Sequence, residues 1–151
     1  MNSNIKAFLD TIAFSEGTSK LGSNNGYDVI VGGTFFTGYA NHPHKLVKIN
    51  DNLSSTAAGR YQLLARYYDA YKKQLNLPDF SPASQDAIAI QQIKECRAYD
   101  DILAGRFYQA VQKCAHIWAS LPGAGYGQRE NKIESLKNVY TTQGGSLTLK
   151  A

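Results

Sequence analysis

The sequence predicts an α+β fold, in which one helix leads into a small antiparallel sheet and several more helices follow. Three observations predict it. Apolar residues recur at helical spacing in residues 2–16, residues 18–60 are rich in Gly, Asn, Thr and Tyr and lack that spacing, and helical spacing dominates the remainder. A chain of 151 residues with 43% hydrophobic and 19% charged residues is long enough for one domain with a sizeable core. We therefore expect a single domain over residues 1–151, with a β-lobe at about 18–60 and a binding cleft between sheet and helices.

The first predicted helix carries a carboxyl group on its apolar face. At about 100° per residue, one face of this helix collects the apolar side chains Ile5, Phe8, Leu9, Ile12 and Ala13. Glu16 falls within about 20° of Ile5, whereas Lys6 and Asp10 point away from this face. Gly17 follows at once and is a natural helix terminator. A carboxyl group is therefore directed toward the core side of the protein at the end of the helix.

This position disfavours the charged form of Glu16. Desolvation and the negative end of the helix dipole both favour a protonated carboxyl group there. A carboxylic acid that keeps its proton near neutral pH can act as a general acid. The alternative is a Glu at a frayed helix end that turns out to water. Glu16 is therefore the candidate catalytic residue.

The segment after the first helix predicts short strands joined by loops. Asp28–Val31 has the composition of a strand, Gly32-Gly33 is a hairpin turn signal, and Thr34–Thr37 reads as the returning strand. Lys45–Ile49 is the third predicted strand and follows the loop NHPH. Together these segments predict a small antiparallel sheet with long loops.

Helices are predicted for the remainder of the chain. Thr56 is the expected N-cap of the first of them, and Ser81-Pro82 pairs an N-cap with proline at the first helical position. Gly105 and Gly144-Gly145 are stop signals. The predicted helices cover residues 56–75, 82–96, 100–103, 107–121 and 130–140.

Charge and hydropathy exclude some classes of function. The net charge is +4, but the basic residues are scattered and no nucleic-acid motif is present, so we expect no nucleic-acid partner. No apolar run approaches the roughly 20 residues that cross a bilayer, so we expect no stable membrane insertion. Asp10 and Glu16 interrupt what would be the apolar core of a signal peptide. We therefore expect synthesis in a cytoplasm, with export by a route that the sequence does not encode.

A buried carboxylic acid in a cleft suggests cleavage of a glycosidic bond. The usual mechanisms need a second carboxylate about 5–9.5 Å away. Asp28 and Asp51 are the candidates in the sheet region, but Asp is common in turns for local hydrogen-bonding reasons, and neither is a convincing partner.

Other chemistries have weaker support. His42 and His44 lie in one loop without a third ligand at a recognisable spacing, so we expect surface histidines and no metal site. Cys96 and Cys114 have no metal-type spacing, and we expect them to be buried free thiols. A disulfide between them is the alternative. The glycine-rich GAGYG follows no strand and lacks the Lys-Ser/Thr of a phosphate loop.

Several motifs, in order, resemble the bacteriophage lambda lysozyme family. The resemblance covers nearly the whole chain, from about Lys6 to Lys137. Its motifs are SEGT at 15–18, GYDVIVGG at 26–33, HP at 42–43, AGRYQLL at 58–64, DFSP at 79–82 and IWASLPGAGYGQ at 117–128. The resemblance implies a lysozyme-like fold, with a mainly helical lobe, a small β-lobe and the active cleft between them. It also implies a phage endolysin that acts as a lytic transglycosylase on peptidoglycan.

The resemblance also implies roles for individual residues. The catalytic Glu of the family falls on Glu16, which would serve as acid and then as base while the C6 hydroxyl of the muramic sugar attacks. This reaction forms a 1,6-anhydromuramic end and needs no second carboxylate, metal or cofactor. The expected substrate contacts are Gln62 and Tyr126 first, Tyr61 and Gln128 from the same motifs, and Tyr39 and His42 at the lip of the cleft.

The chain departs from the family pattern in its loops. Ala57 stands in STAAG where the family has STGAG, His44 stands where the family has Arg, and the loop after SEGT is shorter. We expect these changes to bear on loop mobility and on the charge of the lip, and not on the chemistry.

The resemblance implies a partner and a place of action. The expected partner is the glycan strand of peptidoglycan, and the expected state is a monomer. Release from the host cytoplasm to the periplasm and cell wall would depend on a holin-type pore. Two alternatives stay open: a hydrolytic muramidase that pairs Glu16 with an Asp, and a non-catalytic wall-binding module with the same fold.

Overall fold

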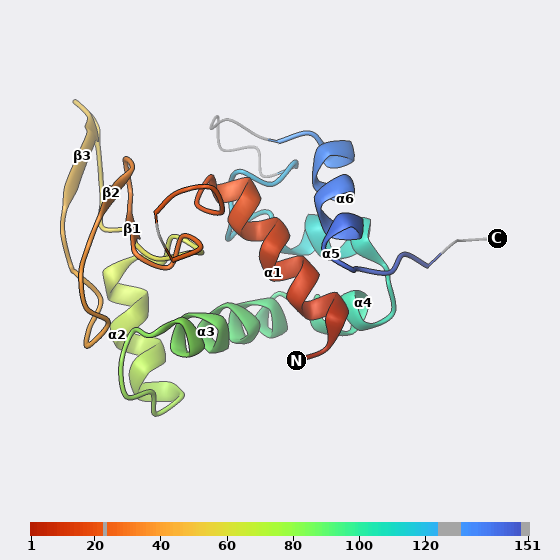
Figure 1. The fold of residues 1–151 in the computed structure, drawn as a ribbon, viewed down its shortest axis with the longest axis horizontal. Coiled ribbons are helices and arrows are strands. Elements are labelled where there is room, and N and C mark those ends of the chain that lie inside the picture. The colour runs from red at the N-terminus through yellow and green to blue at the C-terminus, as the bar shows by residue number, and fades with distance from the viewer. Residues whose placement is uncertain (23, 124–130, 149–151) are drawn as a thin grey trace. The chain divides into compact units, whose positions relative to one another are not determined.

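The computed structural model describes residues 1–22, 24–123 and 131–148 (Figure 1). Along the chain its elements are α1 (Ser3–Glu16), β1 (Val29–Ile30), β2 (Thr34–Phe35), β3 (Val47–Asn50), β4 (Leu53–Ser55), α2 (Ala65–Gln74), α3 (Pro82–Glu95), α4 (Tyr99–Leu103), α5 (Phe107–Cys114) and α6 (Ile133–Thr142). The chain divides into two compact units: unit 1 is Met1–Glu16 with Ala89–Ala151, and unit 2 is Gly17–Ile88, so residues of α3 belong to both. The helices and short antiparallel sheets confirm the α+β class.

The core of unit 1 is built around α1, which packs against α4 and α6 (Figure 1). The predicted apolar face is buried, and Lys6 and Asp10 form an ion pair of 2.8 Å away from it. The Asn2 side-chain oxygen accepts the backbone N–H of Asn4 at 2.8 Å, which satisfies a donor at the start of the helix. Phe107 at the start of α5 packs its ring 6.0 Å from Phe8. The helical periodicity of α1 therefore places Glu16 as predicted, on the side of the helix that meets the rest of unit 1.

The helix predicted over 107–121 is wrong beyond Cys114. After α5 the backbone continues in turns, with the N–H groups of Ile117 and Trp118 both donating to the Cys114 carbonyl at 3.0 and 3.1 Å. Trp118 and Leu121 are nevertheless buried, so apolar spacing in this segment reflects core packing in an irregular chain. The turn brings Ser120 toward the end of α1.

The two cysteines are free thiols, as expected. Cys114 is buried, whereas Cys96 is half-buried. Their side chains share a hydrogen bond, which lowers the pKa of the Cys96 thiol. The same bond, together with burial, raises the pKa of Cys114.

In the part of the chain that the structure describes, unit 2 contains two separate two-stranded sheets, each a short hairpin, where the sequence predicted one sheet. β1 pairs with β2 in the register Val29↔Phe35 and Ile30↔Thr34, and Gly33 in the connecting turn has a φ of +98°. That left-handed conformation suits glycine and confirms the predicted Gly-Gly turn. β3 pairs with β4. The sequence analysis did not identify β4 as a strand.

The helix predicted over 56–75 starts nine residues late. Residues 56–64 form a loop, and α2 covers only Ala65–Gln74. The hydroxyl oxygen of Thr56 does accept the backbone N–H of Ala65 at 3.0 Å, so the predicted cap residue serves this helix from nine positions away. Tyr61 and Tyr68 stand at a helical spacing in the sequence, but Tyr61 belongs to the loop and Tyr68 to α2.

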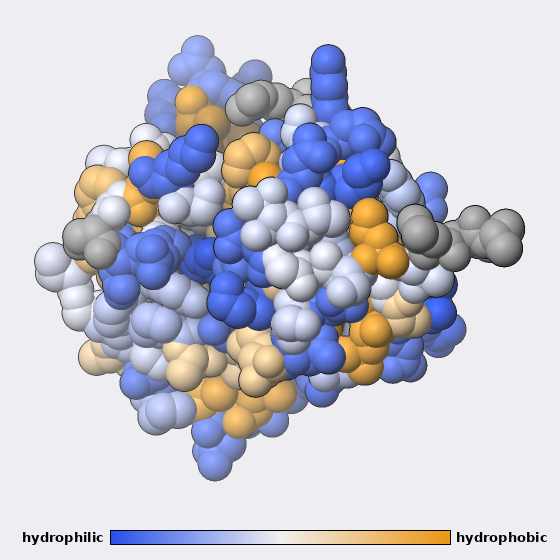
Figure 2. All heavy atoms as spheres, turned by 45° about the vertical axis from the view of Figure 1, so that its right-hand side comes forward, coloured by the Kyte–Doolittle hydropathy of each residue, from blue (hydrophilic) through white to orange (hydrophobic). Residues whose placement is uncertain are grey.

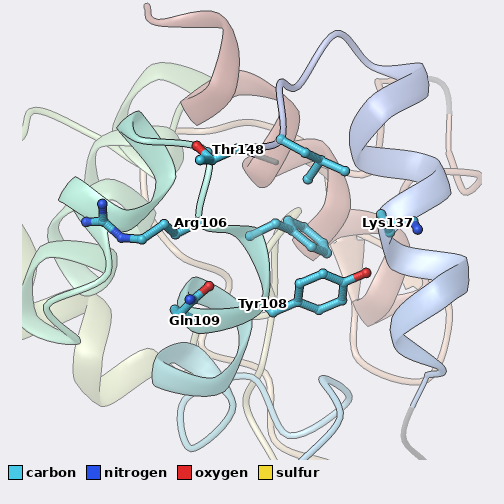
Figure 3. Close-up of a pocket in the computed structure, with 8 residues that line it drawn as sticks. Arg106, Tyr108, Gln109, Lys137 and Thr148 are labelled. Carbon is cyan, nitrogen blue, oxygen red and sulfur yellow. The ribbon is translucent and has the colours of Figure 1, made fainter. Parts of the chain in front are cut away.

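A pocket of about 420 Å³ lies in unit 1 at the start of α5 (Figure 3). Figure 3 shows Arg106 and Lys137 at opposite sides of it. Each cation already has a carboxylate partner, because Arg106 pairs with Asp101 at 2.7 Å and Lys137 with Glu134 at 3.2 Å. The residues that line this pocket include none of the predicted site residues.

On the face shown in Figure 2, hydrophobic residues form separate small groups among hydrophilic ones. None of the helices in the described part of the chain combines the length and apolar character needed to span a bilayer. Within the same part of the chain, no group of three or more His, Cys, Asp or Glu side chains is placed to hold a metal ion.

Candidate active site

Glu16 ends α1, and its side chain is half-buried in unit 1. Gly17 follows with a φ of +81°, which ends the helix directly after the carboxyl group. The hydroxyl of Ser120 donates a hydrogen bond to Oε2 of Glu16. Burial raises the pKa of Glu16 above its ordinary value of 4.5, and the hydrogen bond from Ser120 opposes part of that rise. The site therefore favours a protonated carboxyl group while providing a donor for the charged form.

Gln62 lies in a tight loop of unit 2 that joins Ala58 to Leu63. The backbones of Ala58 and Leu63 exchange hydrogen bonds of 3.0 and 2.9 Å, which closes the loop. Gln62 has a φ of +52°, an uncommon left-handed conformation for a residue with a side chain. Its side-chain amide donates to the Gly59 carbonyl at 2.9 Å. The role of Gln62 as a substrate contact stays a prediction.

Gln85 of α3 holds this loop in place. Its side-chain oxygen accepts the backbone N–H of Arg60 at 2.9 Å, and its amide donates to the carbonyls of Phe80 and Tyr27 at 2.9 and 3.1 Å. The backbone of Gly59 passes close to both side chains. A Cβ added at Gly59 would clash with the side-chain oxygen of Gln85 and would lie 2.9 Å from the Phe80 ring. The loop conformation thus depends on a residue that sequence reasoning did not single out.

We expect Gly59→Ala to destabilise the protein by more than about 1 kcal/mol, because the added methyl group meets Gln85 and Phe80 at a backbone with a φ of +85°. Gly33→Ala is the matched control, since Gly33 has a similar φ of +98° but nothing within 4 Å of an added Cβ. Urea unfolding of the two variants measures the difference. Equal losses would show that the clash at Gly59 is relieved without cost.

Tyr61 is buried beside Gln62. Its hydroxyl donates to Oδ1 of Asp86 at 2.6 Å and accepts a bond of 3.1 Å from Arg60. Burial, followed by the nearby charge of Asp86, raises the pKa of Tyr61. The side chain is therefore anchored within unit 2 through its hydroxyl group.

Tyr39 and His42 also belong to unit 2. The Tyr39 hydroxyl accepts a bond of 2.5 Å from the side-chain amide of Asn24. The expectation of a surface histidine is wrong for His42, which is only 2% exposed. Both of its ring nitrogens are used: Nε2 donates to the Leu63 carbonyl at 2.8 Å, and Nδ1 accepts the His44 N–H at 2.9 Å. Burial lowers the pKa of His42, and the acceptor role of Nδ1 fits the neutral form of the ring. Its nitrogens could contact a ligand only by giving up one of these bonds.

The remaining predicted residues differ in what the structure describes. Tyr126 and Gln128 lie outside the described residues. Asp51 is 97% exposed and pairs with Lys48 at 3.4 Å. Oδ1 of Asp28 is buried and has no hydrogen-bond partner within the described part of the chain. Ser120, which contacts Glu16 directly, was missed as a site residue, although it lies inside the quoted motif IWASLPGAGYGQ.

Comparison with known proteins identifies the family. A model of the family described as "Endolysin" matches residues 6–147, most of the chain. The chain belongs to the endolysin family. The resemblance inferred from the sequence motifs is thereby confirmed, and the family makes the chain a peptidoglycan-cleaving enzyme.

Relatives of this endolysin family member match over nearly their whole length. The endolysin of Escherichia phage lambda is 57% identical over 150 residues, which cover 97% of this chain and 95% of the relative. The endolysin of Escherichia phage P2 is 53% identical over 154 residues, which cover 94% and 93%.

Solved structures agree with the sequence relatives. A structure of bacteriophage lambda lysozyme complexed with a chitohexasaccharide matches with a TM-score of 0.96 and 56% identity, and a second structure of lysozyme from bacteriophage lambda matches with a TM-score of 0.92 and the same identity. Each match covers 98% of both chains. The lysozyme-like fold is therefore confirmed for this endolysin family member.

Proposed function

We propose that this protein is a lytic transglycosylase, which cleaves the β-1,4 bond between N-acetylmuramic acid and N-acetylglucosamine and leaves a 1,6-anhydromuramic end. The observation that carries the proposal is Glu16, a half-buried carboxyl group whose pKa is raised by burial and whose Oε2 accepts a hydroxyl donor. A group of this kind keeps its proton to a higher pH than an ordinary carboxyl group does, and can still exist as a carboxylate after giving that proton up. Both states are needed if one residue serves two proton transfers.

The proposed reaction uses Glu16 twice. The protonated acid gives its proton to the glycosidic oxygen as the bond from that oxygen to C1 of the muramic sugar breaks. The resulting carboxylate takes the proton of the C6 hydroxyl on the same sugar while the C6 oxygen forms the new bond to C1, with help from the sugar's own N-acetyl group. The nucleophile is part of the substrate, so its high effective concentration replaces an enzyme nucleophile and no water is consumed.

The sequence motifs supply the proposed substrate contacts. We assign Gln62 and Tyr126 to the acetamido groups near the reacting bond, with Tyr61 and Gln128 beside them in the same motifs. Tyr39 and His42 are assigned to the lip of the site. The strained backbone of Gln62 and the firm anchoring of its loop support the first of these assignments.

The lambda lysozyme in one of the matched structures is bound to a chitohexasaccharide, a glycan chain. Together with family membership, this supports peptidoglycan glycan strands as the partner of the present chain. We also propose that residues 1–151 act as a single catalytic domain and as a monomer. Release through a holin-type pore, from the host cytoplasm to the periplasm and cell wall, completes the proposal.

Mass spectrometry of muropeptides released from purified peptidoglycan tests the proposed reaction. We expect products with anhydromuramic ends, and no oxygen-18 uptake when the digestion is run in labelled water. Products one water heavier would instead support a hydrolytic muramidase that uses Asp28 or Asp51 with Glu16. Binding to the walls without soluble products would indicate a non-catalytic wall-binding module.

A further inference from the structure

We propose that Ser120, Ser15 and Asn131 are positioning residues for Glu16, and that they act through a single chain of hydrogen bonds that ends on its carboxyl group. The proposal rests on the proposed catalytic role of Glu16. It concerns three residues that the proposed reaction does not yet use. The three residues come from separate segments of unit 1. Ser15 is in the last turn of α1, Ser120 is in the turn after α5, and Asn131 precedes α6.

The contacts define the direction in which the hydrogen bonds of this chain are donated. The hydroxyl of Ser120 donates to Oε2 of Glu16, so its one hydrogen is used there. The bond of 2.7 Å between the hydroxyls of Ser15 and Ser120 must then be donated by Ser15. The side-chain amide of Asn131 donates to the hydroxyl oxygen of Ser15 at 3.1 Å. Hydrogen bonds are therefore donated from Asn131 to Ser15, from Ser15 to Ser120 and from Ser120 to Glu16.

Asn131 is held so that only its amide nitrogen can face this chain. That nitrogen also lies 3.0 Å from the carbonyl oxygen of Ser15 and 3.3 Å from the carbonyl oxygen of Ser120. Carbonyl oxygens only accept hydrogen bonds, so the amide nitrogen must face them. The backbone N–H of Asn131 donates to the Ser120 carbonyl at 2.8 Å as well. Asn131 therefore fastens the end of α1 to the turn that carries Ser120.

A chain of donors in one direction favours the charged carboxylate, because each bond polarises the next. Burial works in the opposite sense and favours the protonated acid. Without the chain, Glu16 would hold its proton more tightly and its carboxylate would be less well supported after the first proton transfer. The chain also fixes the direction of the carboxyl group, on which proton transfer to a bound sugar depends.

The test uses Ser120→Ala, which ends the chain before it reaches Glu16. We expect kcat to fall by about 10- to 100-fold with KM little changed, because the carboxyl group loses its orientation. We also expect the alkaline limb of the pH–rate profile to move to higher pH, since the influence that lowers the pKa of Glu16 is removed. Muropeptide release from purified peptidoglycan measures both effects.

Three further variants separate positioning from general damage. Ser120→Thr keeps a hydroxyl group and should restore most of the activity and the original pH limb. Ser135→Ala makes the same chemical change at an exposed position of α6 and should leave the profile unchanged. Ser15→Ala removes the middle of the chain at a helix position that alanine favours, so it should remain folded and shift the pH limb in the same direction by a smaller amount.

Two results would overturn the proposal: a folded Ser120→Ala enzyme with the wild-type pH profile, or a Ser120→Thr enzyme as impaired as Ser120→Ala. If Ser120→Ala fails to fold, the same decision rests on Ser15→Ala. Failure of the proposed function would give a different result. The Glu16→Gln enzyme would then stay active, independently of the activities of the Ser120 and Ser15 variants.

Discussion

Replacing Glu16 with Gln is expected to reduce peptidoglycan cleavage by at least about 1,000-fold, because the amide can neither give the first proton nor take the second. The shape of the side chain is kept, and its oxygen can still accept the hydroxyl of Ser120. Release of soluble muropeptides from purified peptidoglycan measures the loss. Glu134→Gln is the matched control, since this exposed carboxyl group on α6 lies outside the proposed machinery and its loss should leave activity unchanged.

The same substitution should increase stability at neutral pH. The folded state raises the pKa of Glu16 above 4.5, so it binds a proton more tightly than the unfolded chain does. That preference stabilises the fold fully below the unfolded pKa, and the contribution is lost as pH rises through the folded pKa. Gln resembles the protonated acid at every pH. The free energy of unfolding of Glu16→Gln should therefore exceed that of the wild type at pH 7, and the two should converge below about pH 4.

Normal clearing of cell walls by the folded Glu16→Gln protein would refute the assignment of the site. If the variant is inactive but less stable than the wild type at pH 7, the statement that burial raises the pKa of Glu16 would be refuted instead. The activity and stability measurements thus test two different statements about one residue.

Phe80→Ala should have the largest effect on stability, about 3–5 kcal/mol. Phe80 is 1% exposed, and its ring lies 5.1 Å from that of Tyr68, 4.9 Å from that of His42 and 6.0 Å from that of Phe36. Truncation leaves a cavity in the core of unit 2 directly beneath Gly59. We also expect KM to rise, because the loop that carries Gln62 loses its support.

Phe35→Ala provides the comparison for this prediction. Phe35 lies on β2 in the same unit, and half of its side chain is exposed, so its truncation should cost less than about 1 kcal/mol. Urea unfolding of both variants measures the two free energies. Similar losses would show that the ring of Phe80 is not part of a tightly packed core.

The parts of the site that could be predicted depend on local sequence. The 3.6-residue period of α1 placed Glu16 on the core side of the helix, and Gly17 ended the helix directly after it. Gly32-Gly33 likewise predicted the β1–β2 turn, because few other residues tolerate that conformation. The function followed from several motifs taken together, since one carboxyl group on a helix does not identify a reaction.

The parts that could not be predicted depend on contacts between distant residues. Ser120 lies 104 residues from Glu16, and no spacing rule connects them. Tyr61 fits a helical period with Tyr68 and Tyr71, but residues 58–63 form a loop, because the Gln85 side chain, 25 residues from Arg60, stabilises another conformation. The helix at α5 was extended too far for a similar reason, because Trp118 and Leu121 are buried in turns.

Titration of Glu16 itself tests the central claim most directly. Carbon-13 NMR of selectively labelled glutamate, assigned with Glu16→Gln, gives the pKa of this carboxyl group in the folded enzyme. We predict a pKa above the ordinary value of 4.5 that coincides with the alkaline limb of the kcat/KM profile, as expected if the protonated acid begins the reaction. A pKa at or below 4.5, or an alkaline limb that does not follow Glu16, would contradict the account.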